Sequence, residues 1–309
     1  MSGVGGVEPP VDDADVPRYW RDLGLPGLID AHVHFLPERV QAKVWKFFED
    51  AEAHYGAHWP IAYALPDDDE RLAVLERLGV RAFPTLPYPH KAGMGAWLND
   101  WSAEFAAAHP RVIQSATFFP EPEAPFYVAE ALDRGARIFK VHVQVGNFDP
   151  RHRLLDPVWG RLEETGTPIV IHCGSGPLAG EHTGPQPVSG LLERYPRLQL
   201  VIAHLGMPEY REFLDLAERY DRVHLDTTMF ATDFTQRLMP FDAADLPRLA
   251  ALQDRVLLGS DFPSIPYPYA HQLAALHRLG LGEDWLRAVL WGTGARRFGL
   301  EAAGPRASS

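Results

Sequence analysis

Hydrophobic and polar positions alternate along most of this chain in a repeating order of two kinds of segment. Short apolar runs are each followed by a longer stretch in which apolar residues recur at helical spacing. Short apolar runs bounded by turn residues are typical of buried strands, and the longer stretches are typical of amphipathic helices. Repetition of this pair predicts strand–helix units built around a parallel sheet.

Eight apolar runs are candidate strands. Helical stretches separate them, and several of these stretches end in Gly or before Pro, as helices commonly do. Eight strands with eight crossovers favour a closed (β/α)8 barrel, also called a TIM barrel, and an open doubly wound sheet is the rival arrangement. The candidate strands lie near residues 27–35, 79–86, 112–119, 136–145, 168–174, 198–206, 222–228 and 255–261.

One segment interrupts this rhythm. Residues 36–66 lie between the first strand and its expected helix, and they are too many for a plain connecting loop. They include several aromatic residues, among them Trp45, Phe48 and Trp59. We therefore expect an insertion after the first strand, at the C-terminal face of the barrel where active sites lie. It forms either a lid over a pocket or a helical cap whose aromatic side chains pack on the barrel.

The two ends of the chain differ from the repeating part. Residues 1–20 are rich in Gly, Pro and Asp and predict a mobile N-terminal arm, and residues 303–309 predict a loose C-terminal tail. Residues 21–302 would then form one barrel domain. The N-terminus lacks the basic and apolar regions of a signal peptide, and no run of about 18 apolar residues occurs. We therefore expect a cytoplasmic protein that does not bind membranes.

The charge balance limits the class of partner. The 309 residues include 41 Asp and Glu against 29 Lys and Arg, which gives a formal net charge of −12. Such a charge repels nucleic acids and anionic membrane surfaces. It does not exclude a small anionic substrate, because a metal ion and nearby cations can outweigh the overall charge inside a pocket.

His32 and His34 stand two residues apart in the sequence DAHVHF, at the end of the first candidate strand. Alternate residues of a strand point to the same face, so both imidazoles project into one space. This arrangement suits two ligands of one metal ion. Two histidines are also costly to place inside a barrel without a partner.

Three further candidate strands end in a titratable residue. His172 ends the strand in PIVIHC, His204 the strand in LVIAHLG, and Asp261 the strand in VLLGSDFP. Any one of them alone could face a loop or cap a helix. Taken with His32 and His34, they place imidazoles and a carboxylate at the C-terminal ends of the strands, and these groups are standard ligands of Zn(II).

These motifs resemble those of the amidohydrolase superfamily, which has an HxH after the first strand, single histidines after the fifth and sixth, and an aspartate after the eighth. More narrowly, IDAHVHFLP, IVIHCGSGP, VIAHLG and LLGSDFP are similar to the amidohydrolase-related (amidohydrolase 2) branch that includes aminocarboxymuconate semialdehyde decarboxylase-like enzymes. The resemblance covers roughly residues 27–300. It implies a metal-dependent enzyme on a (β/α)8 barrel.

The resemblance also implies roles for individual residues. His32, His34, His172 and Asp261 are the implied metal ligands, and His204 is the implied catalytic histidine that orients or deprotonates water on the metal. Asp261 can also accept the proton of the nucleophile. A divalent metal lowers the pKa of bound water toward about 7, and histidine is suited to move that proton. Zn(II) is the expected ion, and Mn(II), Fe(II) or Co(II) would suit the same ligands.

Lys140 and His142 share one face of the fourth candidate strand, in RIFKVHVQV, and both can point into the barrel mouth. In binuclear members of the superfamily a carboxylated lysine after the fourth strand bridges two metal ions. Lys140 is therefore such a bridge, a cation that acts on the substrate or tunes the site, or part of a structural ion pair. We favour the second interpretation and expect one metal ion, with His142 near the ion and not bound to it.

The loop PYPHKAGMGAW follows the second candidate strand and would lie at the same barrel mouth. His90 and Lys91 of this loop could bind a carboxylate of the substrate. An ordinary solvated loop is the alternative interpretation.

Three functions are compatible with these residues. The first is hydrolysis of a lactone, amide or ester in a small, carboxylated or cyclic molecule by metal-activated water. The second is non-oxidative decarboxylation of an unsaturated or aromatic acid, and the third is a non-catalytic barrel that binds a small acid or a metal. A fixed cation beside the metal would favour decarboxylation, and a neutral pocket would favour hydrolysis. The candidate cations are Arg39, Arg81, Lys91, Arg151 and Lys140. A homodimer is expected by family analogy alone.

Overall fold

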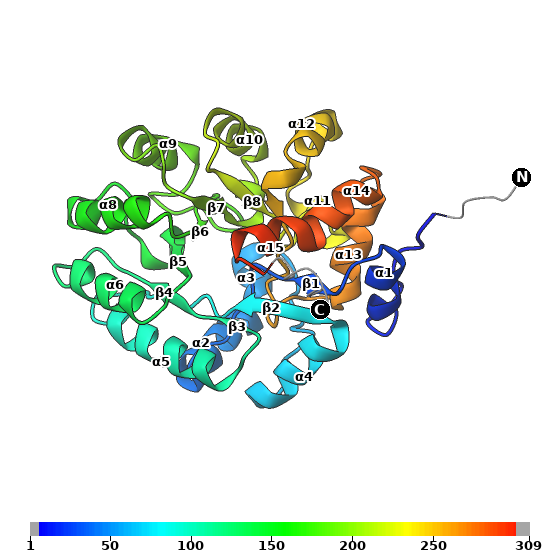
Figure 1. Cartoon of the computed structure of the whole chain (residues 1–309), viewed down its shortest axis with the longest axis horizontal. Coiled ribbons are helices and arrows are strands. Elements are labelled where there is room, and N and C mark those ends of the chain that lie inside the picture. Colours follow the sequence, from blue (N-terminus) through cyan, green and yellow to red (C-terminus); the bar gives the residue numbers. More distant parts are fainter. Residues whose placement is uncertain (1–5, 301–309) are drawn as a thin grey trace, which may run out of the picture.

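In the computed structural model, which describes residues 6–300, short parallel strands form a ring that is surrounded by helices (Figure 1). Parallel pairing joins consecutive strands in two runs, from β1 to β3 and from β4 to β9. The strands are β1 (Leu28–Ile29), β2 (Val80–Pro84), β3 (Val112–Ile113), β4 (Ser115–Thr117), β5 (Ile138–His142), β6 (Ile169–His172), β7 (Leu200–Ile202), β8 (His224–Asp226) and β9 (Val256–Leu257).

The ring closes in the way that the eight candidate strands predict. β3 and β4 are separated by Gln114 alone, so they are two halves of the third barrel strand. Between the first and last strands, Ala31 N donates to Leu258 O at 2.7 Å, and Val33 forms an isolated parallel bridge with Phe262. The observed strands are shorter than the apolar runs, because each run also includes the turn that follows the strand.

Helices follow the strands around the outside of the ring. The helix after residues 36–66, α4, shows how the sequence sets its ends: the Asp67 side chain accepts from Glu70 N at its start, and Gly79 adopts a left-handed φ of 84° at its end. The outer helices are α4 (Asp68–Leu78), α5 (Gly95–Ala108), α6 (Ala124–Asp133), α8 (Asp156–Thr165), α9 (Pro185–Arg194), α10 (Tyr210–Arg219), α12 (Leu246–Ala251) and α13 (Tyr269–Arg278).

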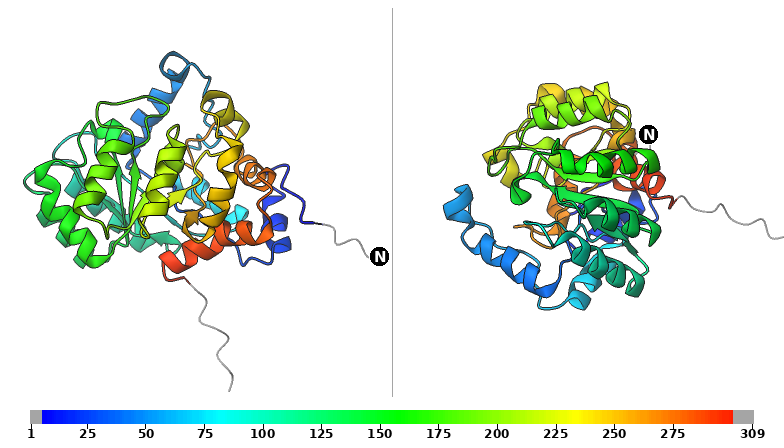
Figure 2. Two further views of the ribbon diagram at one scale, coloured as in Figure 1. Left: turned by 90° about the horizontal axis from the view of Figure 1, so that it is seen from above. Right: turned by 90° about the vertical axis from the view of Figure 1, so that its left-hand side faces the viewer.

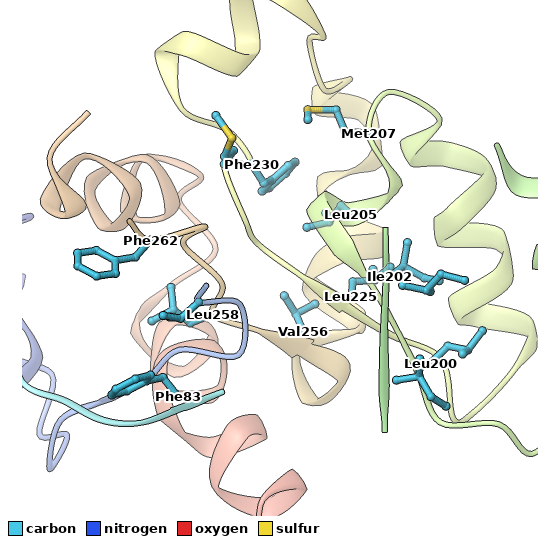
Figure 3. Close-up of a cluster of buried hydrophobic side chains, with 14 of the residues drawn as sticks. Phe83, Leu200, Ile202, Leu205, Met207, Leu225, Phe230, Val256, Leu258 and Phe262 are labelled. Carbon is cyan, nitrogen blue, oxygen red and sulfur yellow. The ribbon is translucent and has the colours of Figure 1, made fainter. Parts of the chain in front are cut away.

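Two apolar clusters lie on the two faces of the ring. Alternation along β6 illustrates this, because Ile169 and Ile171 belong to the cluster between strands and helices, whereas Val170 belongs to the cluster inside the barrel. Figure 3 shows part of the outer cluster, where Leu200 and Leu225 come from neighbouring strands. The inner cluster fills the end of the barrel at which the strands begin, and polar groups are left for the other end.

The two ends of the barrel are covered by different elements. α14 (Glu283–Arg287) and α15 (Thr293–Arg297) follow α13, and Ala295 of α15 packs into the inner cluster. Residues 36–66 contain α2 (Glu38–Glu49) and α3 (Ala51–Tyr55). Figure 2 shows α2 and α3 projecting at one end and α15 at the opposite end. Whether residues 36–66 are an insertion relative to the family stays a prediction.

The expected terminal segments lie partly outside the described residues, and the C-terminal tail of 303–309 lies wholly outside them. The later part of the expected arm packs on the barrel. α1 (Val16–Asp22) begins within it, and its Val16 and Tyr19 side chains are fully buried. The packed part of the chain therefore begins before residue 21. Within residues 6–300, no helix has both the length and the hydrophobicity needed to cross a lipid bilayer.

Candidate metal centre and cavity

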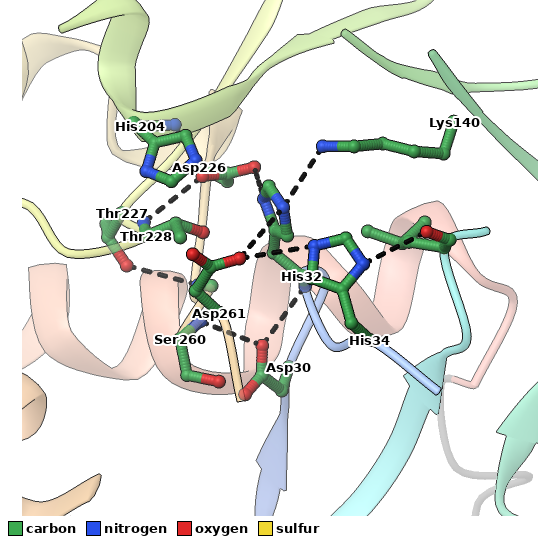
Figure 4. A network of polar contacts seen from close by, with 12 residues as sticks. Asp30, His32, His34, Lys140, His204, Asp226, Thr227, Thr228, Ser260 and Asp261 are labelled. Carbon is green, nitrogen blue, oxygen red and sulfur yellow. Dashed lines mark hydrogen bonds and ion pairs between the residues drawn. The ribbon is translucent and has the colours of Figure 1, made fainter. Parts of the chain in front are cut away.

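His32 and His34 follow β1 and point their Nε2 atoms toward Asp261, which follows β9 (Figure 4). The distances to Asp261 Oδ1 are 3.5 Å from His32 Nε2 and 3.2 Å from His34 Nε2. These three side chains form the cluster that could hold a metal ion among the described residues. Two ligand atoms about 2.1 Å from a tetrahedral ion are roughly 3.4 Å apart, so the observed spacing suits one ion.

Hydrogen bonds fix the tautomers of both histidines. His32 Nδ1 donates to Asp226 Oδ2 at 2.9 Å, and His34 Nδ1 donates to Leu86 O at 3.0 Å. In the neutral rings the lone pairs are therefore on the two Nε2 atoms, which face a carboxylate oxygen. Acceptors this close repel one another unless a positive charge lies between them. The donor set thus fits a divalent cation, which would lie against the two Nε2 lone pairs and the Asp261 carboxylate.

Asp226, at the end of β8, links three parts of the site. Its Oδ2 accepts from His32, and its Oδ1 accepts from His204 N at 2.9 Å and from Thr228 N at 3.1 Å. The side chain is fully buried. Burial acts to raise the pKa of Asp226, but the pairing with His32 outweighs it and holds this pKa well below the ordinary value. The buried carboxylate is therefore charged and acts as an acceptor only.

Asp30 joins the two segments that bear the metal candidates. Its Oδ1 accepts from His32 N at 3.1 Å and from Ser260 N at 3.1 Å, next to Asp261. Tyr269 OH donates to the other oxygen at 2.9 Å. Burial raises the pKa of Asp30 to about 7, although these hydrogen bonds oppose the rise. Figure 4 shows Asp30 and Ser260 below the histidines.

His204 lies beside this cluster on a strained turn after β7. It adopts φ 55° and ψ 31°, a left-handed conformation that is costly for a residue with a Cβ. Its ring centroid is 5.2 Å from that of His32, and within residues 6–300 its buried Nδ1 has no hydrogen-bond partner. Burial lowers the pKa of His204 to about 4, so the ring is neutral at neutral pH and can accept a proton.

Lys140 reaches the cluster from β5 on the opposite side of the barrel. Its fully buried Nζ donates to His32 Nε2 at 3.1 Å, the same atom that faces Asp261. Burial lowers the pKa of Lys140 to about 8, while the negative charges of Asp226 and Asp261 oppose that change. The expectation that Lys140 points into the barrel is confirmed, and its role stays a prediction.

His172 and His142 lie next to each other in register on β6 and β5. Their rings stack with centroids 3.9 Å apart. His172 Nε2 lies 3.3 Å from Gly176 O, and His172 does not belong to the three-residue cluster of ligand atoms. The structure thus brings His172 to the edge of the site, 4.6 Å from the His204 ring, and its role as a ligand stays a prediction.

A cavity of about 720 Å³ opens above these residues at the C-terminal ends of the strands. His32, His34, His204 and Asp261 lie on its wall, together with His142 and His172. α2 and α3 form one side of it, and the segments after β1, β2, β5, β6, β7, β8 and β9 form the rest. His90 and Lys91 line the cavity, so the predicted position of that loop at the barrel mouth is confirmed.

The wall of the cavity is apolar with a cationic rim. Arg39 and Lys43 of α2 and Lys91 of the loop after β2 line it, all three exposed, and Asp261 is the only acidic residue on the described wall. Burial first, and then the charges of Lys91 and Lys43, lower the pKa of His90. The charges of Lys43 and Lys91 therefore both act on the part of the opening where His90 lies.

The sequence analysis missed Asp226, Asp30 and Lys43. Asp226 ends the apolar run RVHLDTT in the same way as Asp261 ends its own run, so the rule that selected Asp261 could have selected it. Asp30 precedes the first histidine and gives no comparable signal. Lys43 is one of several charged residues in 36–66, and only the fold shows that it faces the cavity.

The family model for amidohydrolases matches residues 29–300, which is most of the chain. The chain belongs to the Amidohydrolase 2 family. This family includes hydrolases and decarboxylases, so membership confirms the branch expected from the motifs and leaves the reaction open. It also implies a small-molecule substrate. The expected homodimer is not tested by it and stays a prediction.

Similar solved structures share the barrel at low sequence identity. An uncharacterised TIM-barrel protein from Bordetella bronchiseptica has a TM-score of 0.70 and 20% identity, over 88% of this chain and 98% of that one. The 5-carboxyvanillate decarboxylase from Sphingomonas paucimobilis has a TM-score of 0.62 and 19% identity, over 88% of this chain and 99% of that one. A probable 2-pyrone-4,6-dicarboxylic acid hydrolase from Acinetobacter baumannii, solved with citric acid, has a TM-score of 0.55 and 14% identity, over 88% and 99%. No curated protein sequence matches significantly.

Proposed function

We propose that this protein is a metal-dependent hydrolase that cleaves an ester, lactone or amide bond in an organic acid. The convergence of His32 Nε2, His34 Nε2 and Asp261 Oδ1 at the base of the cavity carries the proposal. When bound there, a divalent ion would polarise a carbonyl oxygen and lower the pKa of a water molecule. We propose Zn(II), and Mn(II), Fe(II) or Co(II) suit the same donors.

His204 and Asp261 are the residues that we propose to move protons. His204 is neutral and its buried Nδ1 lacks a partner within residues 6–300, so it can take a proton from the nucleophile or return one to the leaving group. The Asp226 bond to its backbone holds it in place. We propose His172 as a further ligand, because it lies beside His204 on the same wall.

The positions of four of the five candidate cations favour hydrolysis over decarboxylation. Arg81 donates to Pro26 O, and Arg151 is paired with Asp149. Arg39 and Lys91 lie at the exposed rim of the cavity. None of these four side chains lies beside the metal candidates, where a departing carboxylate would need a fixed positive charge.

One observation supports decarboxylation as the second candidate. Lys140 Nζ lies 3.1 Å from His32 Nε2, and it is the one cation among those considered that contacts a metal candidate. A carboxylate beside the histidines could pair with it. The similar structure named as a 5-carboxyvanillate decarboxylase agrees with this alternative at the level of the fold.

Isotope incorporation distinguishes the two reactions. Zinc-loaded protein is incubated with a panel of aromatic and unsaturated acids and with their esters and lactones. Hydrolysis in ¹⁸O-labelled water places one label in the carboxyl product for each bond cleaved. Decarboxylation in heavy water releases carbon dioxide and places deuterium on the carbon that lost it. Carbon dioxide without ¹⁸O incorporation would replace our proposal by the second candidate.

A further inference from the structure

The cavity is far larger than the cluster of metal candidates needs, and its chemistry changes from base to rim. His32, His34 and His204 at the base are buried, whereas Arg39, Lys43 and Lys91 at the rim are exposed. A volume of about 720 Å³ is in the range of pockets for drug-sized ligands, which are mostly apolar with a few placed polar groups. The remaining wall would therefore contact most of the substrate and help to select it.

The remaining wall of the cavity is lined by side chains that adapt to apolar ligands. The chain has five methionines, and every one except Met1 lines the cavity, namely Met94, Met207, Met229 and Met239. Methionine is flexible and polarisable, and it is used where an apolar surface must fit varied shapes. Aromatic side chains, among them Phe48 and Trp59, complete this wall.

Apolar side chains also reach the opening itself. Seven large hydrophobic residues are exposed within the described part of the chain, and four of them line this cavity. These are Phe47, Trp97, Val145 and Leu238, which are 37–47% exposed. Scattered exposed apolar residues are ordinary, but a concentration at one opening indicates a surface for an apolar ligand.

The charge at the rim is opposite in sign to the net charge of the chain. Acidic residues outnumber Lys and Arg by 41 to 29 over the whole chain, yet the described wall has Arg39, Lys43 and Lys91 against one aspartate at the base. None of the three cations forms an ion pair with an acidic residue in the range 6–300. Unpaired like charges that share an opening repel one another, and an anionic ligand would relieve that repulsion.

We propose that the cavity binds an elongated amphipathic anion lengthwise. The bond to be cleaved lies at the base, an aromatic or aliphatic body lies against the methionine wall, and a carboxylate or other acidic group lies at the rim between Lys43, Lys91 and Arg39. The acidic group is thus distant from the reacting bond. The position of the reacting end rests on the proposed function, whereas the apolar body and the distal anion rest on the cavity alone.

Two fluorescent probes that differ by one acidic group test this arrangement. 8-Anilinonaphthalene-1-sulfonate has an apolar body and a sulfonate, and N-phenyl-1-naphthylamine has the same body without it. Both are titrated into metal-free protein and into Lys43→Glu and Lys46→Glu variants. Lys46 is the matched control, because it is exposed on the same helix and does not line the cavity. We expect Lys43→Glu to weaken sulfonate binding at least fivefold, with Lys46→Glu and the neutral probe changed less than twofold.

Three outcomes would overturn the proposal. Equal losses of sulfonate affinity in Lys43→Glu and Lys46→Glu would mean that the overall charge, and not a specific site at the rim, attracts the anion. Weakening of sulfonate binding by His34→Ala in place of Lys43→Glu would put the anion at the base. Undiminished binding of both probes to Val44→Trp, which adds bulk to the cavity wall, would place the probes elsewhere. Because the titrations use metal-free protein, their result is independent of zinc binding and hydrolysis, which test the proposed function.

Discussion

A single carboxylate, Asp226, sets the direction in which His32 presents its lone pair. In Asp226→Asn the amide oxygen would keep the backbone bonds to His204 and Thr228, so the amide NH₂ would face His32 Nδ1. Two donors cannot pair, and His32 would therefore move its proton to Nε2. We expect zinc affinity to fall by about 10- to 100-fold.

Calorimetric titration of zinc into this variant measures the effect. Asp254→Asn is the matched control, because Asp254 is an exposed aspartate paired with Arg296, and it precedes β9 whereas Asp261 follows that strand. Unchanged zinc affinity in Asp226→Asn would mean that the tautomer of His32 is set by another group.

The buried Lys140 makes stability depend on pH in the metal-free protein. Its pKa falls from 10.5 to about 8 on folding, so between these values the unfolded chain binds more protons and stability rises with pH. The full cost of burying the charge, roughly 3 kcal/mol, is present below pH 8 and is relieved by about pH 10.5.

Denaturant unfolding at several pH values, with the wild type compared with Lys140→Met, tests this dependence. The stability difference between the two proteins should shrink or reverse as the pH rises from 8 to 10.5. The comparison cancels other groups, such as buried tyrosines, that titrate in the same range. A difference that is constant with pH would show that Lys140 stays charged in the folded state.

At the scale of elements, the site depends on close approach of β8, β9 and the segment after β1. Gly259 follows β9, and a Cβ built there would lie 2.9 Å from His32 Cβ and would also overlap the Thr228 hydroxyl. Gly259→Ala should therefore displace His32, cost about 2 kcal/mol or more in stability and weaken zinc binding.

Gly160, inside α8, provides the opposite case. A Cβ at this position meets no atom within 4 Å, so Gly160→Ala should stabilise the protein by about 0.5–1 kcal/mol through helix propensity. Thermal and denaturant unfolding of both variants checks the pair. Two variants of equal stability would contradict the close packing of Gly259 on His32.

The sequence predicts elements well where one periodicity holds and poorly where contacts cross between elements. The apolar runs ending in His172, His204 and Asp261 are local patterns, and each residue lies at the strand end that its run predicts. The pairing of Asp226 with His32 joins residues that are 194 positions apart, and no local pattern encodes it. The packing of α1 on the barrel was missed for the same reason, since a Gly- and Pro-rich segment before it suggested a free arm.

At the scale of the whole molecule, a bound metal ion couples the two edges of the barrel. His32 and His34 belong to the first strand and Asp261 to the last, so an ion held by all three would fasten the closure of the ring. Zinc should therefore raise the unfolding temperature of the wild type and not that of His32→Ala or Asp261→Ala.

Thermal unfolding with and without zinc also separates metal ligands from catalytic residues, and elemental analysis counts the ions. His204→Ala should keep the stabilisation by zinc and lose activity, and loss of that stabilisation would make His204 a ligand. Elemental analysis should find about one metal ion per chain, unchanged in Lys140→Ala. Two ions per chain that fall to fewer in this variant would replace our single-ion site by the lysine-bridged pair.

The placement of the methionines makes the cavity unusually easy to observe. Because every methionine after Met1 lines it, a protein labelled with ¹³C in its methionine methyl groups would give a spectrum in which all internal signals report on this one space. A compound that enters the cavity would shift several of these resonances together, whereas one that adheres to the outer surface would shift none. Candidate substrates can therefore be ranked by nuclear magnetic resonance before any turnover has been detected.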